Sequence, residues 1–274
     1  MKKKNNTNFL LILIFLAGLS LMLYPTVSEY WNSLHASRAI ASYSEKVSSL
    51  DQNSYDQLWQ DACDFNSSIF QRTNVFRLSE EEARLYQQTL NLSGNGIMGY
   101  VEIPEISSVL PIYHGTDEAV LQIAVGHLEW TSLPVGGEGT HCVLSGHRGL
   151  PSAKLFSDLD KITEGDTFVL RVLDEVLTYE VDQILIVEPN VTDNLRIEEG
   201  RDYCTLVTCT PYGINTHRLL VRGHRIENAP EARIVRITAD AAQIEPLLVA
   251  PVIAIPLVMI LMIPLMLPGR HRYR

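Results

Sequence analysis

A cysteine and an arginine nine positions apart are the residues of this sequence whose types and spacing most suggest chemistry. They lie in "TLVTCTPYGINTHRLLVRGHR", where two apolar runs flank a loop of turn-forming residues. If these runs form a hairpin that is symmetric about Gly213 and Ile214, Cys209 lies directly opposite Arg218 on the same face. The arginine cation would favour the reactive thiolate and could stabilise an oxyanion. The spacing alone leaves open a quieter interpretation, a buried thiol beside a surface charge.

A general acid and base for such a site is best supplied by His147. This residue follows the apolar run "CVLS" and sits in "SGHRG", between Gly146 and Gly149. Loops at strand ends collect binding and catalytic residues, although a structural role for one loop histidine stays open. We expect hydrogen-bonded structural roles for four other histidines, namely His114, His127, His141 and His224.

The segment that must position these residues is predicted to be mainly β. From residue 97 onward, seven short runs rich in Val, Ile, Leu, Tyr and Thr are separated by Gly, Pro and Asp. Short helices are expected at 118–123 and 153–159. So many strands within residues 97–227 predict a closed or nearly closed β-barrel. Residues 28–96 are predicted to be helical, with Ser79 and Glu82 spaced as a capping box.

Two apolar runs predict a membrane span at each end of the chain. Residues 1–27 hold three lysines and then an apolar run, and residues 247–268 hold a second run before a basic tail at 269–274. Residues 228–246 are predicted to be a linker. The basic flanks place both termini in the cytoplasm and the middle of the chain outside the cell. A cleaved signal peptide is the alternative for the first run.

Charge and cysteine content narrow the classes of function. The chain has a formal net charge of −10, and residues 28–267 carry 16 basic against 32 acidic side chains. This balance argues against a nucleic-acid partner, which needs a basic surface. The four cysteines include no Cys-x-x-Cys pair, so we predict no zinc site and no other metal or cofactor. Cys142 and Cys204 are expected to be small core residues.

Long motifs in the sequence resemble the sortases. "HLEWTSLPVGGEGTHCVLSGHRGLPSAKLFSDLDKI" together with "TLVTCTPYGINTHRLLVRG" is similar to the class C, pilus-building members, over about residues 99–226. The order His, Cys, Arg also agrees with this family and differs from papain-like enzymes. The resemblance implies an eight-stranded sortase β-barrel, with short helices, an N-terminal helical segment and a transmembrane helix at each end.

The resemblance also implies roles for the three residues. Cys209 would be the nucleophile, His147 the general acid and base, and Arg218 the oxyanion or substrate clamp. The substrate would be a pilin subunit with a Leu-Pro-x-Thr-Gly-like sorting signal, cleaved between Thr and Gly through a thioester and passed to a pilin lysine without a cofactor. A housekeeping sortase that attaches proteins to peptidoglycan is the first alternative. A non-catalytic, membrane-tethered pilus assembly module is the second.

One departure from the resemblance concerns access to the site. Class C sortases usually carry a lid with an Asp-Pro-aromatic motif in the N-terminal region, whereas residues 28–103 contain no proline. The sequence therefore predicts that the usual aspartate–aromatic anchor does not lock this site.

Overall fold

The structure is a computed structural model that describes residues 3–71 and 77–228, with side chains from residue 10 onward. The linker, the second span and the basic tail predicted for residues 228–274 fall almost wholly outside the described residues.

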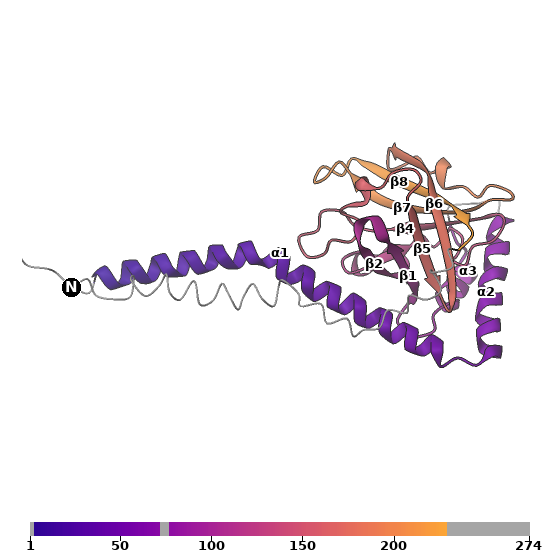
Figure 1. Cartoon of the computed structure of the whole chain (residues 1–274), viewed down its shortest axis with the longest axis horizontal. Coiled ribbons are helices and arrows are strands. Elements are labelled where there is room, and N and C mark those ends of the chain that lie inside the picture. Colours follow the sequence, from indigo (N-terminus) through magenta and orange to yellow (C-terminus); the bar gives the residue numbers. More distant parts are fainter. Residues whose placement is uncertain (1–2, 72–76, 229–274) are drawn as a thin grey trace, which may run out of the picture.

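Eight strands form a closed barrel, as the sequence predicted (Figure 1). Their order around the barrel is β1-β2-β3-β4-β7-β8-β6-β5. The β2–β3 and β4–β7 pairs are parallel and the other pairs are antiparallel, so the sheet is mixed. The strands are β1 (Ile97–Ile103), β2 (Ser108–His114), β3 (Val125–His127), β4 (Thr140–Ser145), β5 (Thr167–Val172), β6 (Glu175–Val187), β7 (Asp202–Thr210) and β8 (His217–Ile226).

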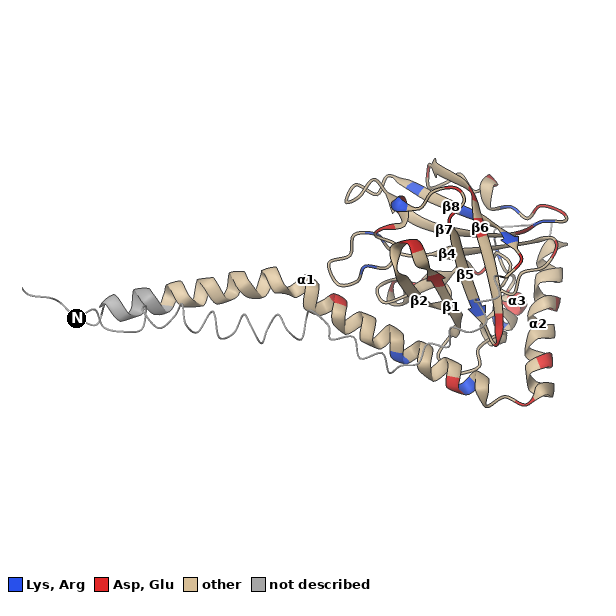
Figure 2. Ribbon diagram, in the orientation of Figure 1, with Lys and Arg blue, Asp and Glu red and all other residues tan. Residues whose placement is uncertain are grey.

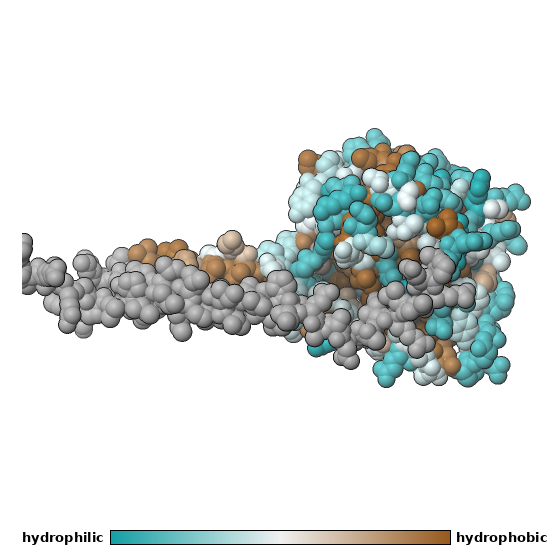
Figure 3. All heavy atoms as spheres, viewed as in Figure 1, coloured by the Kyte–Doolittle hydropathy of each residue, from teal (hydrophilic) through white to brown (hydrophobic). Residues whose placement is uncertain are grey.

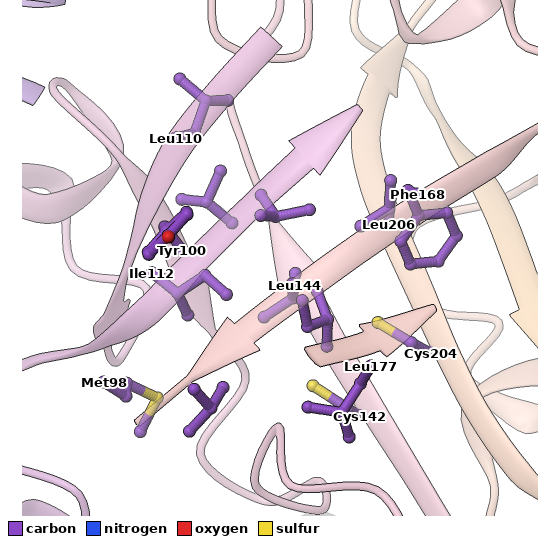
Figure 4. Close-up of a cluster of buried hydrophobic side chains, with 14 of the residues drawn as sticks. Met98, Tyr100, Leu110, Ile112, Cys142, Leu144, Phe168, Leu177, Cys204 and Leu206 are labelled. Carbon is purple, nitrogen blue, oxygen red and sulfur yellow. The ribbon is translucent and has the colours of Figure 1, made fainter. Parts of the chain in front are cut away.

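The barrel interior is filled by apolar side chains from most strands (Figure 4). Met98, Ile112, Leu144, Phe168 and Leu206 are fully or almost fully buried there. Alternate residues of each strand supply this core, because successive side chains point to opposite faces of the sheet. The barrel is therefore a packed scaffold, and chemistry must take place at its ends.

Three helices precede the barrel. They are α1 (Lys3–Ser48), α2 (Gln52–Phe70) and α3 (Glu80–Gln88), and α3 begins with the predicted Ser79–Glu82 capping box. The N-terminal part of α1 extends away from the barrel, and from residue 10 onward it carries no charged side chain until Glu29 (Figures 1 and 2). This helix is long and apolar enough to cross a membrane.

The C-terminal half of α1 belongs to the core. Ile40, Tyr43 and Val47 are buried together with side chains of α2 and of the barrel. The Tyr43 hydroxyl donates a 2.8 Å hydrogen bond to the Met98 carbonyl and accepts a 2.7 Å bond from the Leu173 backbone N–H. One buried hydroxyl thus joins α1 to β1 and to the β5–β6 turn.

Four short elements connect the strands in the described chain. They are α4 (Glu118–Leu121) and the 3₁₀ turns η1 (Pro104–Ile106), η2 (Leu159–Lys161) and η3 (Asp193–Leu195). The helix predicted at 118–123 is present as α4.

The helix predicted at 153–159 is wrong. This stretch forms turns that lead into the 3₁₀ turn η2 (Leu159–Lys161). Leu155 has a positive φ of 38°, and the Phe156 N–H bonds to the carbonyl of His147 in place of a helical partner. The β3 strand has three residues, too few for an alternating pattern, and was not among the seven predicted runs.

Three of the histidines expected to be structural have buried hydrogen-bond partners. His114 bonds to the carbonyls of Gly96 and Thr89, and His127 contacts the Tyr86 hydroxyl and the Ser132 carbonyl. The His141 ring lies between the Arg196 carbonyl and the Thr205 hydroxyl. Each ring therefore has partners that hold it in the fold.

Replacing Tyr43 by Phe should destabilise the protein by about 1–3 kcal/mol, because it leaves a buried N–H and a buried C=O unpaired. Urea unfolding of the full chain in detergent measures this change. Tyr55→Phe is the matched control, since the Tyr55 side chain is only partly buried and its hydroxyl bonds to exposed Glu175 at 3.2 Å. An equal effect of the two substitutions would contradict the structural role of Tyr43.

Stability should also fall in mild acid because of His141. Burial lowers the pKa of His141 to about 4, from an ordinary value of 6.5. Between these values the unfolded chain binds a proton that the folded chain excludes, so the free energy of unfolding drops as pH falls from 6.5 towards 4, by up to about 3 kcal/mol. Unfolding titrations of the native chain and of His141→Gln at several pH values measure this pH-dependent loss in the free energy of unfolding. The free energy of unfolding of the variant should depend less steeply on pH than that of the native chain. Equal slopes would show that His141 does not cause the loss of stability in acid.

Candidate active site

The predicted pairing of Cys209 with Arg218 is present. β7 and β8 form an antiparallel hairpin in which Cys209 is the direct cross-strand partner of Arg218, flanked by the pairs Thr208–Leu219 and Thr210–His217. This is the register that symmetry about Gly213 and Ile214 predicted. Cys209 is half-buried near the end of β7, so its thiol lies at the barrel mouth and not in the interior.

His147 comes from the strand on the other side of β7. β4 is parallel to β7, with Ser145 level with Val207. Beyond β4, the Gly146 N–H bonds to the Val207 carbonyl at 3.0 Å, and the Thr208 hydroxyl bonds to the Gly146 carbonyl at 2.8 Å. The register is thus held one residue past the strand, and counting one step further along it pairs position 147 with position 209. β8, which carries Arg218, and β4, which leads to His147, lie on opposite sides of β7.

Two glycines allow the chain to leave β4 in this way. A Cβ atom at Gly146 would lie 2.7 Å from the ring of Phe156. Gly149 has a φ of +77°, and a Cβ atom there would lie 2.9 Å from the ring of Tyr212 in the β7–β8 loop. Close packing therefore requires glycine at both positions of "SGHRG". The contact between Gly149 and Tyr212 also packs the His147 loop against the loop that follows Cys209.

The Arg218 guanidinium is anchored by its own loop. Its Nη1 donates to the carbonyls of Asn215 at 3.3 Å and of His217 at 3.1 Å. Within the described chain, Nε and Nη2 make no further hydrogen bond or ion pair. A planar cation held by one nitrogen keeps its other donors available for an oxygen that develops negative charge.

Glu118 is a neighbour of His147 that sequence reasoning missed. Its carboxylate Oε2 lies 3.8 Å from Nε2 of His147, and it also accepts a short hydrogen bond from the Gln122 amide. Glu118 begins α4, which lies 29 positions before His147 in the sequence. Only the folded barrel brings the two together, and no local spacing signals the contact.

Other charged residues of the opening stretch have structural partners. Arg222 forms a two-pronged ion pair with Asp182, with both distances 3.0 Å, and its guanidinium lies 4.2 Å from the ring centre of Tyr203. Arg225 donates to the carbonyls of Thr178 and Val176. These contacts agree with strand and surface roles for both arginines.

The remaining cysteines are unlike Cys209. Cys142 and Cys204 are fully buried cross-strand neighbours on β4 and β7, and both point into the core (Figure 4). Burial raises the pKa of the Cys204 thiol well above its ordinary value. Cys63 is half-buried on α2. The two buried thiols thus pack as small core residues, as expected.

The predicted absence of an aspartate–aromatic lock is not tested, because residues 72–76 are outside the described chain. Within residues 28–71 and 77–95, no hydrogen bond or ion pair reaches Cys209, His147 or Arg218. Several side chains of this region are core residues, including Phe65, Tyr86 and Leu90. The segment that holds α2 and α3 therefore contributes side chains to the core of the domain.

The described side chains include no cluster of three or more His, Cys, Asp or Glu residues arranged to hold a metal ion. The groups gathered at the barrel mouth are a thiol, an imidazole and a guanidinium. Together these groups can supply nucleophilic attack, proton transfer and oxyanion stabilisation.

Comparison with solved structures gives extensive matches. The crystal structure of sortase C1 from Streptococcus agalactiae is 49% identical, with a TM-score of 0.69, and the match covers 70% of this chain and 100% of that one. The crystal structure of Streptococcus pneumoniae sortase C is 47% identical, with a TM-score of 0.63, and the match covers 70% of this chain and 99% of that one.

Sequence comparisons give the same family. The sortase domain matches residues 101–226, which span the barrel and all three candidate residues. Sortase D of Bacillus subtilis is 31% identical over 131 residues, a match that covers 47% of this chain and 63% of that relative. Barrel, site geometry and similarity agree that this chain belongs to the sortase family, whose members are cysteine transpeptidases, and that its structural neighbours are class C sortases.

Proposed function

We propose that this chain is a transpeptidase that joins pilin subunits at the outer face of the cell membrane. The proposal is carried by the cross-strand pairing of Cys209 with Arg218, on a strand whose other neighbour, β4, leads to His147. The 49% identity to a class C enzyme over that enzyme's whole length supports the pilin substrate, as does the description of the pneumococcal relative in terms of pilin substrate specificity.

The proposed reaction has two halves. The Cys209 thiolate attacks the threonine carbonyl of a Leu-Pro-x-Thr-Gly-like signal, and Arg218 stabilises the oxyanion that forms. His147 protonates the departing glycine amine, which leaves a thioester. His147 then accepts a proton from an incoming pilin lysine, whose amine attacks the thioester and forms an isopeptide bond. These steps use only side chains of the enzyme and its two substrates.

The proposed topology follows the basic flanks of the sequence. α1 is retained as the N-terminal anchor, residues 247–268 form a second span, and both termini lie in the cytoplasm. The barrel and its site then face the extracellular side. Such a site meets pilin subunits after they have been exported.

Substitution of the three residues should separate their roles. Cys209→Ala should abolish polymers of a sorting-signal pilin, because no other described thiol lies at the barrel mouth. Arg218→Ala should lower kcat by about 10²–10³, the usual cost of losing one oxyanion donor. Arg218→Lys should recover part of this loss, since it keeps the charge and loses the planar fork. The measurement is the rate at which ladders that survive boiling in detergent appear.

Cys63→Ala is the matched control for these variants, because Cys63 is half-buried on α2 outside the site, and it should leave the ladders unchanged. Normal ladders with Cys209→Ala would rule out the nucleophile and favour a non-catalytic assembly module. Efficient transfer to an oligoglycine acceptor, with no pilin ladder, would point instead to attachment of proteins to peptidoglycan.

Access to the thiol is tested by labelling kinetics. In a Cys63→Ala background, the rate of modification of Cys209 by a small methanethiosulfonate should rise linearly with reagent concentration. A linear increase is expected if no segment of the protein has to move away from Cys209 before the reagent can reach the thiol. A rate that reaches a plateau at high reagent concentration would reveal a closing segment and contradict the prediction of an unlocked site.

A further inference from the structure

The contacts of α1 determine which way the active site faces. The apolar run at residues 10–27 is about 27 Å long as a helix, close to the roughly 30 Å thickness of a hydrocarbon core. Asn32 lies five residues beyond it, about 7.5 Å along the helix axis, which is the depth of the lipid headgroups. Exposed Trp31 and half-buried Tyr30 lie in the same turn, as aromatic residues do at membrane interfaces.

The same turn of α1 touches the loop that carries His147. The Asn32 side-chain amide donates a 2.8 Å hydrogen bond to the Ser152 carbonyl. Glu29, on the same face of the helix, lies near enough to Lys154 for the charge and backbone N–H of that residue to favour the ionised carboxylate. The loop that follows His147 is thereby held at the level where α1 leaves the membrane.

The β7–β8 loop lies beside this loop. The Tyr212 ring packs against Gly149, and the Arg148 guanidinium lies 5.9 Å from the centre of the Tyr212 ring. In Figure 1 the orange turn between β7 and β8 projects from the barrel on the side towards which α1 extends. Figure 3 shows apolar side chains along α1 and again at that edge of the barrel.

The tip of the β7–β8 loop is apolar and exposed. Tyr212 is 63% exposed and Ile214 is 68% exposed, although neither is needed for the core. Two acidic groups of the neighbouring loop are paired with basic side chains. Arg148 pairs with Asp160, and Asp158 lies 2.9 Å from Lys154 and 3.0 Å from Lys161. These ion pairs lower the repulsion between this loop and an anionic lipid surface.

We propose that the active-site end of the barrel faces the membrane, and that the tip formed by Tyr212 and Ile214 enters the lipid headgroup region. This inference rests on the proposed anchoring by α1. It places the thiol of Cys209 beside the bilayer surface. The enzyme would then meet a sorting signal just as the signal emerges from the membrane.

A fluorescent probe at the loop tip tests the proposal. The full chain carries Cys63→Ser and Cys209→Ala, so that the buried Cys142 and Cys204 are the only native thiols left. Ile214→Cys is labelled with an environment-sensitive nitrobenzoxadiazole dye and placed in vesicles of phosphatidylcholine and phosphatidylglycerol. Thr216→Cys supplies a second probe on the same loop. Gln60→Cys, exposed on α2, is the matched control.

The expected result is a blue shift for the probe at position 214, with stronger quenching by headgroup-labelled than by mid-chain-labelled lipid. The probe at 216 should show a smaller shift, and the control at position 60 none. Solvent-like emission from both loop probes, in protein that floats with the vesicles, would overturn the membrane-facing site. A shift that appears only when sorting-signal peptide is added would assign the tip to substrate and also overturn it. Failure of the protein to float would refute the anchor itself, a separate outcome.

Discussion

The backbone register of β7 with its two neighbours is the constraint on which the site depends. On one side the antiparallel pairing with β8 places Arg218 across from Cys209, and on the other the parallel pairing with β4 leads to His147. A one-residue slip of β7 would turn Cys209 into the core and remove it from both partners. The bond from Thr208 to the Gly146 carbonyl extends the β4–β7 register beyond the strand, so the position of His147 does not depend on a free loop.

The sequence predicted the features that depend on local pattern. The hairpin register followed from the symmetry of one loop, and the α3 cap followed from the spacing of Ser79 and Glu82. The pairing of Cys209 with Arg218 was therefore available from residues 205–225 alone. Seven of the eight strands were long enough to show their alternating or apolar pattern, whereas β3 was too short.

Features that depend on contacts between distant residues could not be predicted in this way. The proximity of Glu118 to His147 arises from the packing of α4, and the helix expected at 153–159 is displaced by a bond to the His147 carbonyl. The parallel pairing of β4 with β7 joins strands about 60 residues apart, as in Cys142 with Cys204. Spacing alone thus left His147 with two interpretations, whereas the fold sets it on the loop that follows β4, the parallel neighbour of the cysteine strand.

Helix α1 connects its own apolar stretch to the barrel through the core itself. A flexible tether would let the barrel take any orientation above the bilayer, but α1 continues from its apolar stretch into the packed interior without a break. Tyr43 fixes it to β1 and to the β5–β6 turn, and Asn32 fixes it to the loop that follows His147. Because these contacts lie at opposite ends of the packed half of α1, the helix cannot swing freely about either one. The distance and direction of the Cys209 thiol relative to the C-terminal half of α1 are therefore set by the fold.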